Sequence, residues 1–162
     1  MLTLPTIVKR KAQPYAAIRQ ETKIPFQTVI SKTLPKVEKW LGKRSVEHGP
    51  MLIKYDFINM PELTLQLGFL LDEAIEGDEK VMVGILPAGK YATLTYWGHY
   101  KNLRDVTGML IDWARGRGIA WDADESPGGD SFASRFELYP NGPDDEPDPD
   151  KWETQIFIKV RG

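Results

Sequence analysis

The sequence predicts an α+β protein, built as a tandem pseudo-two-fold repeat of strand-strand-helix-strand-strand modules. Helices should cover one face of an antiparallel sheet and leave a ligand cleft on the other. Two observations support this fold class. Two segments with helical spacing of apolar residues each have a pair of strand-like segments before and after them, and this order occurs once in each half of the chain. Because two such units lie side by side, a ligand pocket is expected at their junction.

A weak internal repeat links the two halves. Residues 12–18 read AQPYAAI and residues 88–94 read AGKYATL, and each stretch follows an apolar-rich run and precedes a helix-like segment that contains one Trp. The offset of 76 residues is about half of the 162-residue chain, which favours duplication over chance. We therefore expect one domain over residues 1–162, with repeat units at about 4–73 and 79–160.

The first unit has four segments with the apolar patterns of strands, near 6–11, 14–22, 50–58 and 63–71. Between the second and the third, the segment FQTVISKTLPKVEKWL (26–41) predicts a helix with one buried face. Pro35 lacks a backbone N–H, so we expect it to kink this helix or split it in two. The sequence NMPE predicts a hairpin loop between the last two strands.

The second unit repeats this order, with strands expected near 80–86, 90–97, 131–139 and 153–160. A helix is expected near 101–116, and two glycines end it. The segment AWDADESPGGD (120–130) is predicted to be a loop. A second loop is expected at PNGPDDEPDPDK (140–151), because its four prolines and five acids suit water and not a core.

Composition excludes several classes of function. The net charge is −2, from 21 basic and 23 acidic residues, and no basic stripe suggests direct nucleic-acid binding. The chain has no cysteine, and its two histidines, His48 and His99, are far apart, so we expect no metal site. It has no phosphate-loop motif, and we expect no cofactor. No apolar run approaches the length of a membrane span, so we expect a soluble, cytoplasmic protein.

One carboxylate lies inside a strand-like segment, SFASRFELY (131–139). Alternation puts Glu137 and Tyr139 on the side opposite Phe136 and Leu138. We expect Phe136 and Leu138 to face the helices, and Glu137 to face a cleft or water. From composition alone, the better interpretation is a solvated carboxylate paired with Arg135 or a lysine, and a pocket carboxylate is the alternative.

Aromatic residues on other strands are candidate ligand contacts. Tyr55 and Phe57 lie in PMLIKYDFI, where alternation gives them one face together with Met51 and Ile53. Rings of this kind stack on flat ligands or attract a cation, each for about 0.5–2 kcal/mol. Ordinary core packing is the alternative for Tyr55, and the same ambiguity holds for two further aromatics, Trp97 and Tyr139.

Several stretches resemble the GyrI-like effector-binding domains of the AraC-type effector-binding superfamily. The first half matches at GPMLIKYDF followed by LTLQLGF, and the second half at LPAGKYATLTYWGHYKNL with a downstream Trp113. The ending matches at RFELYP, a Pro/Asp loop and DPDKWETQIFIKV. The resemblance covers about residues 4–160. It implies two similar modules with pseudo-two-fold symmetry and a ligand cleft between them.

The resemblance also implies a function. Such domains are often fused to a helix-turn-helix segment and bind small cationic or aromatic drugs. Because this chain begins directly with the first strand, a stand-alone small-molecule binding form is implied. The resemblance puts Glu137 on the pocket floor as the anionic anchor, with the aromatic contacts Tyr55, Phe57, Trp97 and Tyr139 around it.

Two alternatives remain open within the resemblance. Some relatives hydrolyse cyclopropane-bearing genotoxins, which implies a catalytic Glu137 that acts as general base. Another blocks DNA gyrase, which implies a protein partner and an exposed apolar patch. The residues predict no oligomeric state.

Overall fold

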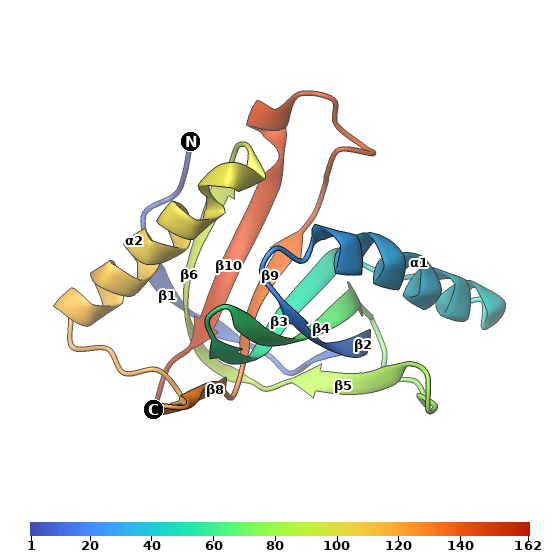
Figure 1. The fold of residues 1–162 in the computed structure, drawn as a ribbon, viewed down its shortest axis with the longest axis horizontal. Coiled ribbons are helices and arrows are strands. Elements are labelled where there is room, and N and C mark those ends of the chain that lie inside the picture. Colours follow the sequence, from blue (N-terminus) through green and yellow to red (C-terminus); the bar gives the residue numbers. More distant parts are fainter.

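A single sheet of ten strands forms the centre of the computed structural model, which describes residues 1–162 (Figure 1). Two α-helices, α1 (Gln27–Lys43) and α2 (Leu103–Gly116), and two short 3-10 helices, η1 (Tyr100–Asn102) and η2 (Pro149–Lys151), connect the strands. In chain order the strands are β1 (Thr6–Arg10), β2 (Gln13–Lys23), β3 (Met51–Asn59), β4 (Glu62–Leu70), β5 (Met82–Leu86), β6 (Gly89–Trp97), β7 (Ala123–Ser126), β8 (Gly129–Phe132), β9 (Arg135–Tyr139) and β10 (Glu153–Lys159).

Eight of the strands follow one path, in the order β1-β6-β10-β9-β3-β4-β2-β5. All of these neighbours are antiparallel. Exchanging the two halves of the chain reverses the order, so that β1 and β5 are equivalent edge strands and β3 and β9 meet in the centre. The first strand of each half pairs with the second strand of the other half, β1 with β6 and β5 with β2. The predicted α+β class and its duplicated strand order are confirmed.

The elements differ from the expected ones in two places. The expected loop 120–130 contains β7 and the start of β8, which form a hairpin that pairs with the end of β3. The expected strand 131–139 is interrupted between β8 and β9, so the sheet has ten strands and not eight. The helix α1 continues through Pro35 without splitting, because buried side chains on both sides of the proline, Thr33 and Val37, hold it on the sheet. No helix combines the length and the apolar character that a membrane span needs.

One face of the sheet curls around an apolar cluster of its own. The nine members come from seven strands of the path, and Val8 of the eighth strand, β1, packs against them. Such a cluster is possible only if the two ends of the sheet bend toward each other. The members are Tyr15, Ala17, Leu52, Leu70, Leu86, Tyr91, Phe136, Leu138 and Phe157. No helix residue belongs to this cluster. Our expectation that Phe136 and Leu138 face the helices is therefore wrong. Alternation shows which residues share a face, but not which face the helices cover.

Both helices pack on the opposite face, as expected. Residues of α1 such as Val37 and Leu41 pack on Ala16 and Phe69 of β2 and β4, and residues of α2 pack on β6 and β10. In Figure 1, α1 and α2 lie over the two sides of the sheet, and β9 and β10 run between them. The middle of the helix-bearing face is thus the part of the sheet to which both halves of the chain contribute.

The close contact of β4 with β2 at Gly68 gives a test of this packing. A Cβ at Gly68 would lie 1.8 Å from the carbonyl oxygen of Ala16. Since backbone atoms must move to admit it, we expect Gly68→Ala to lower the free energy of unfolding by roughly 1–3 kcal/mol, measured by denaturant titration. Gly108→Ala in α2 is the control, because its Cβ meets nothing within 4 Å and the change should stabilise the helix by up to about 1 kcal/mol. A Gly68→Ala variant as stable as the wild type would contradict the packing described.

Candidate functional site

A cross-strand row on the helix-bearing face places Glu137 at the centre of the protein. Paired residues run from β4 to β6 in the order Leu67, Ile53, Glu137, Ile156 and Leu94. Leu67 and Ile53 pack with residues of α1, whereas Ile156 and Leu94 pack with residues of α2. Glu137 is the one charged member of this row and is only 7% exposed. It therefore lies where the two halves of the chain meet, on the same face as the helices.

Two tyrosines hold one oxygen of the Glu137 carboxylate. The hydroxyl of Tyr55 on β3 donates to Glu137 Oε1 at 2.8 Å, and the hydroxyl of Tyr139 on β9 donates to the same atom at 2.5 Å. Both tyrosines also pack against the apolar cluster under α1. Burial, reinforced by the nearby charge of Glu137, raises the pKa of both tyrosines well above its usual range. Both hydroxyls therefore stay protonated and can donate.

The other oxygen of Glu137 is free. Oε2 accepts no hydrogen bond from the protein, and no Lys, Arg or His lies within 4.0 Å of the carboxylate. Glu137 keeps 7% of its surface exposed, and Oε2 is not among the completely buried polar atoms without a partner. Burial raises the pKa of Glu137, while the Tyr139 and Tyr55 hydroxyls and the charge of Arg135 partly oppose this shift. The interpretation that Glu137 pairs with Arg135 or a lysine in water is wrong, because Glu137 is buried and makes no ion pair.

An aromatic row continues from Tyr139 toward the end of the sheet. The ring of Tyr100 in η1 lies 5.7 Å from that of Tyr139 and stacks on Trp152 at 4.8 Å, and His99 lies 5.4 Å from Trp152. Sequence reasoning missed Tyr100, because it lies in a connection and follows no strand alternation. The available signal was its position at the start of the helix that leads away from β6.

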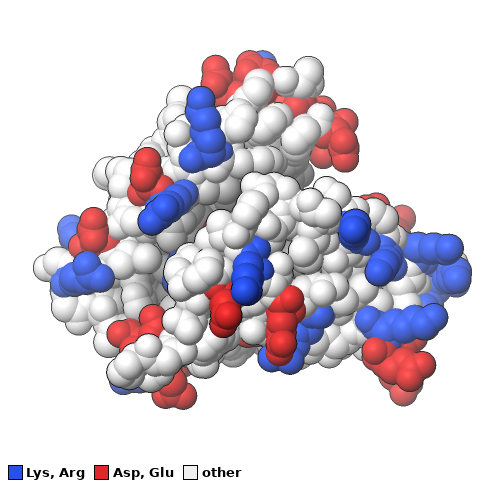
Figure 2. Space-filling view, viewed as in Figure 1, with Lys and Arg blue, Asp and Glu red and all other residues white.

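The acidic loop 140–151 lies beside this aromatic row. Trp152 Nε1 donates to the backbone oxygen of Glu146 at 2.7 Å, and the charge of Asp145 adds to burial in raising the pKa of Tyr100. Figure 2 shows Asp and Glu gathered at the top, over this loop, and Lys and Arg gathered at the right, over α1. The end of the site formed by Tyr100 and Trp152 therefore has a negative rim.

Two of the predicted aromatic contacts lie elsewhere. A β-bulge in β3 inserts Asp56 between Tyr55, which pairs with Leu65, and Phe57, which pairs with Thr64. Because of the extra residue, Tyr55 and Phe57 point to opposite faces, so the expectation that they share a face is wrong. Trp97 lies at the end of β6 and lines a separate hollow of about 380 Å³ with Met1, Asp150 and Lys151. The structure thus brings Tyr55 and Tyr139, but not Phe57 and Trp97, onto Glu137.

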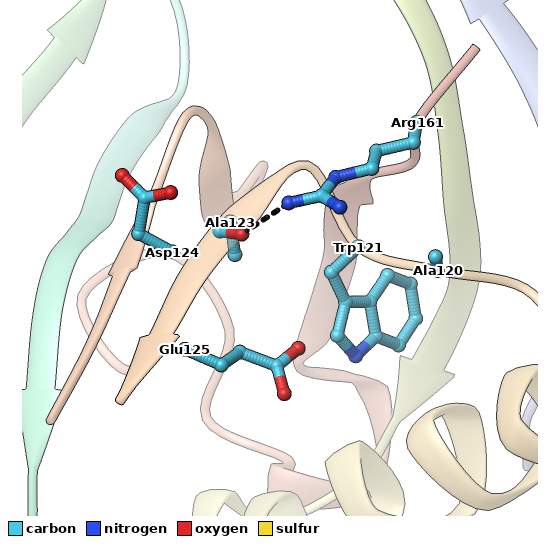
Figure 3. Close-up of a pocket in the computed structure, with 6 residues that line it drawn as sticks. All are labelled: Ala120, Trp121, Ala123, Asp124, Glu125 and Arg161. Atoms are coloured by element: carbon cyan, nitrogen blue, oxygen red, sulfur yellow. Dashed lines mark hydrogen bonds between the residues drawn. The ribbon is translucent and has the colours of Figure 1, made fainter. Parts of the chain in front are cut away.

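A second hollow, of about 420 Å³, lies near the C-terminus, away from Glu137 (Figure 3). Figure 3 shows the carboxylate of Glu125 near the indole of Trp121, with Asp124 directed to the other side of β7. Arg161 crosses the hollow and donates to the backbone oxygen of Ala123 at 2.8 Å. Its acids are exposed and its arginine already has a partner. Neither of these two hollows contains the buried unpaired charge, and we place the candidate site at Glu137.

Comparison with known proteins gives a family match and a set of similar folds. Residues 4–161 match the family model of the GyrI-like small molecule binding domain. No curated protein matches the chain. The C-terminal domain of EcmrR is 15% identical with a TM-score of 0.80, and the alignment covers 98% of this chain and 97% of that domain. In a complex of EcmrR with DNA, this chain spans only 57% of the EcmrR chain, at 16% identity and a TM-score of 0.79 over 98% of this chain.

Two other solved structures are similar over nearly the whole chain. SAV2435 bound to tetraphenylphosphonium is 12% identical with a TM-score of 0.64, and the alignment covers 99% of this chain and 95% of that one. A hydrolase from Listeria innocua is 9% identical with a TM-score of 0.63, over 97% of this chain and 91% of that one. At these identities the likeness shows the fold alone.

The buried charge of Glu137 gives a prediction about stability and pH. Because folding raises the pKa of Glu137, the folded protein binds the proton more tightly than the unfolded chain. Stability is therefore lost as pH rises from the unfolded-state pKa through the folded-state pKa, and the loss is complete above it. Glu137→Gln removes the charge, so its Tm should exceed that of the wild type by roughly a few degrees at pH 7, and the difference should shrink below pH 4.

Differential scanning calorimetry of the wild type and Glu137→Gln across this pH range measures the effect. Glu125→Gln makes the same chemical change at an exposed residue of β7, and its Tm should stay close to that of the wild type. A Glu137→Gln variant that is less stable than the wild type at pH 7 would contradict the unfavourable burial of the charge.

Proposed function

This chain belongs to the GyrI-like small molecule binding domain family, and we propose that it binds amphipathic aromatic or cationic compounds with Glu137 as the anionic anchor. The ligand would lie on the helix-bearing face, between the residues packed under α1 and those packed under α2. This differs from the cleft expected on the helix-free face, because that face packs on its own apolar cluster. One observation carries the proposal: Glu137 is buried and has no cationic partner, and two tyrosines hold one of its oxygens while the other is free.

The burial of Glu137 without a cationic partner costs free energy. A carboxylate removed from water without a cation loses solvation that costs several kcal/mol, even after hydrogen bonds recover part of it. A ligand cation beside Oε2 would supply the missing attraction. The site is therefore more complementary to a positive ligand than to a neutral or negative one of the same shape.

The surroundings suit a flat or aromatic ligand. Tyr139, Tyr100 and Trp152 form a row of rings, and each ring can contribute about 0.5–2 kcal/mol to a cation placed over it. The acidic loop beside this row would also draw cations toward it from solution. Tetraphenylphosphonium, with which SAV2435 was solved, combines a positive charge with four aromatic rings and is a suitable probe.

Isothermal titration calorimetry with tetraphenylphosphonium tests the proposal. We expect the wild type to bind and Glu137→Gln to bind at least about 10-fold more weakly, because close charge pairs at binding interfaces are coupled by about 1.5–7 kcal/mol. Glu125→Gln is the matched control and should bind like the wild type. If the wild type does not bind this cation or rhodamine dyes, or if Glu137→Gln binds equally well, Glu137 is not the anchor.

Hydrolysis is a second candidate function, which the protonation behaviour of Glu137 favours. Burial raises the pKa of this carboxyl toward the working range of a general base. Its free oxygen could take a proton from a water whose oxygen attacks a strained cyclopropane carbon. The ring C–C bond would break, and its electron pair would pass to an adjoining unsaturated carbonyl group. The proton that Glu137 has taken from the water would then return to this anionic group, which completes the addition of one water and restores the carboxylate. A neighbour described as a hydrolase shares the fold, which leaves this chemistry open to the same scaffold.

Mass spectrometry separates catalysis from binding. The wild type is incubated with a cyclopropane-bearing alkylator, and a product that is heavier by one water is the expected result of hydrolysis. A general base typically contributes ~10²–10⁴-fold to the rate, so Glu137→Ala should lose about that much. Unchanged substrate with the wild type, together with tight binding of the same compound, would assign the site to binding alone.

A further inference from the structure

We propose that Arg135 makes this site prefer ligands that carry an anionic group beside their cationic aromatic part. The inference rests on the proposed binding function and specifies the class of ligand more narrowly. Arg135 is a cation two residues from Glu137 on β9 and makes no ion pair within the protein.

Arg135 shares the face and the strand of Glu137. The two residues are two positions apart on β9, which puts their Cα atoms about 6–7 Å apart with both side chains on the helix-bearing face. Arg135 pairs across the sheet with Ile158, one of the residues under α2. Its guanidinium lies 4.9 Å from the ring centre of Phe132 and 5.7 Å from that of Tyr55. Arg135 thus bridges the two halves of the site.

Arg135 has no acceptor in the protein, although it is partly buried. No carboxylate lies within 4.0 Å of its guanidinium, which donates no hydrogen bond to any residue. Two lysines of the sheet with little exposure are different: Lys54 pairs with Asp56, and Lys159 pairs with Asp122 at 2.9 Å. Their side chains are 9% and 16% exposed. Arg10 on β1 is also partly buried without a carboxylate partner, but it lies over the rings of Phe136 and Phe157 on the other face of the sheet. Arg135 is therefore the enclosed, unpaired cation that lies beside Glu137.

Tyr55 joins the two unpaired charges into one binding surface. Its hydroxyl donates to Glu137, and its ring faces the guanidinium of Arg135. A ligand that is only cationic would gain the attraction of Glu137 but meet the repulsion of Arg135. A zwitterionic ligand with a carboxylate or a similar planar anion could also accept two parallel hydrogen bonds from the guanidinium. The zwitterionic ligand would therefore pair with both Glu137 and Arg135, whereas the purely cationic ligand would pair with Glu137 alone.

Two dyes that differ at one group test this preference. Rhodamine 110 and rhodamine 123 share the same cationic ring system, but the first carries a free carboxylate where the second carries a methyl ester. Binding is measured by fluorescence anisotropy at pH 7 with the wild-type chain. We expect rhodamine 110 to bind at least about 10-fold more tightly than rhodamine 123, which corresponds to one charge-assisted contact.

Variants of Arg135 assign the preference to this residue. Arg135→Gln should remove the preference for rhodamine 110 and strengthen the binding of tetraphenylphosphonium, whereas Arg135→Lys keeps the charge and should retain part of the preference. Arg19→Gln makes the same change at an exposed residue of β2 and should behave like the wild type. Thermal melts of each variant check that it is folded.

The outcomes separate this inference from the proposed function. Equal affinity of the wild type for the two dyes, or an unchanged preference in folded Arg135→Gln, overturns the role of Arg135. If Glu137→Gln still weakens the binding of both dyes in that case, the proposed binding function stands without the role of Arg135. Failure of both dyes and of tetraphenylphosphonium to bind overturns the binding function and this inference with it.

Discussion

The antiparallel pairing of β3 with β9 joins the two halves of the chain at the centre of the sheet and sets the geometry of the site. Each half of the chain supplies one of these strands, and each half also gives its first strand to the edge of the other half, so neither half has a complete sheet alone. The pairing sets Ile53 against Glu137 in the row that joins the residues under α1 to those under α2. The same pairing brings the hydroxyls of Tyr55 and Tyr139 to one carboxylate oxygen.

The buried carboxylate of Glu137 lowers the stability of the fold, but it also provides a charge that a ligand can complement. An apolar residue in place of Glu137 would fit the row of Leu67, Ile53, Ile156 and Leu94, and burial raises the pKa of the carboxyl that is there instead. The tyrosine hydroxyls satisfy only one of its oxygens. The sheet can hold this charge because the opposite face packs its own apolar cluster from seven strands of the path, with Val8 of β1 against it. The stability of that cluster allows the central position to carry an unfavourable group that a ligand can complement.

A network on the curled face fixes one of the two tyrosines. Lys54 pairs with Asp56, and Gln66 Nε2 donates to Asp56 Oδ2 at 2.6 Å, while the hydroxyl of Tyr15 donates to Gln66 Oε1 at 2.7 Å. These contacts hold the bulge at Asp56, which ends the alternation after Tyr55. The polar groups on the curled face of β3 thereby set the position of Tyr55, whose hydroxyl donates to Glu137 on the helix-bearing face.

Most of the elements and some of the local partners of the site could be predicted from the sequence. The duplicated order of strands and helices, the shared face of Glu137 and Tyr139, and the candidacy of Tyr55 all follow from periodicity, repetition and family resemblance, because these are properties of neighbouring residues. Only the tertiary structure decided which face the helices cover, that Asp56 turns Phe57 away, and that Tyr100 joins the site while Arg135 stays unpaired beside Glu137. These depend on strand register and on the curl of the sheet, which arise from contacts between residues far apart in the chain, and no local pattern encodes them.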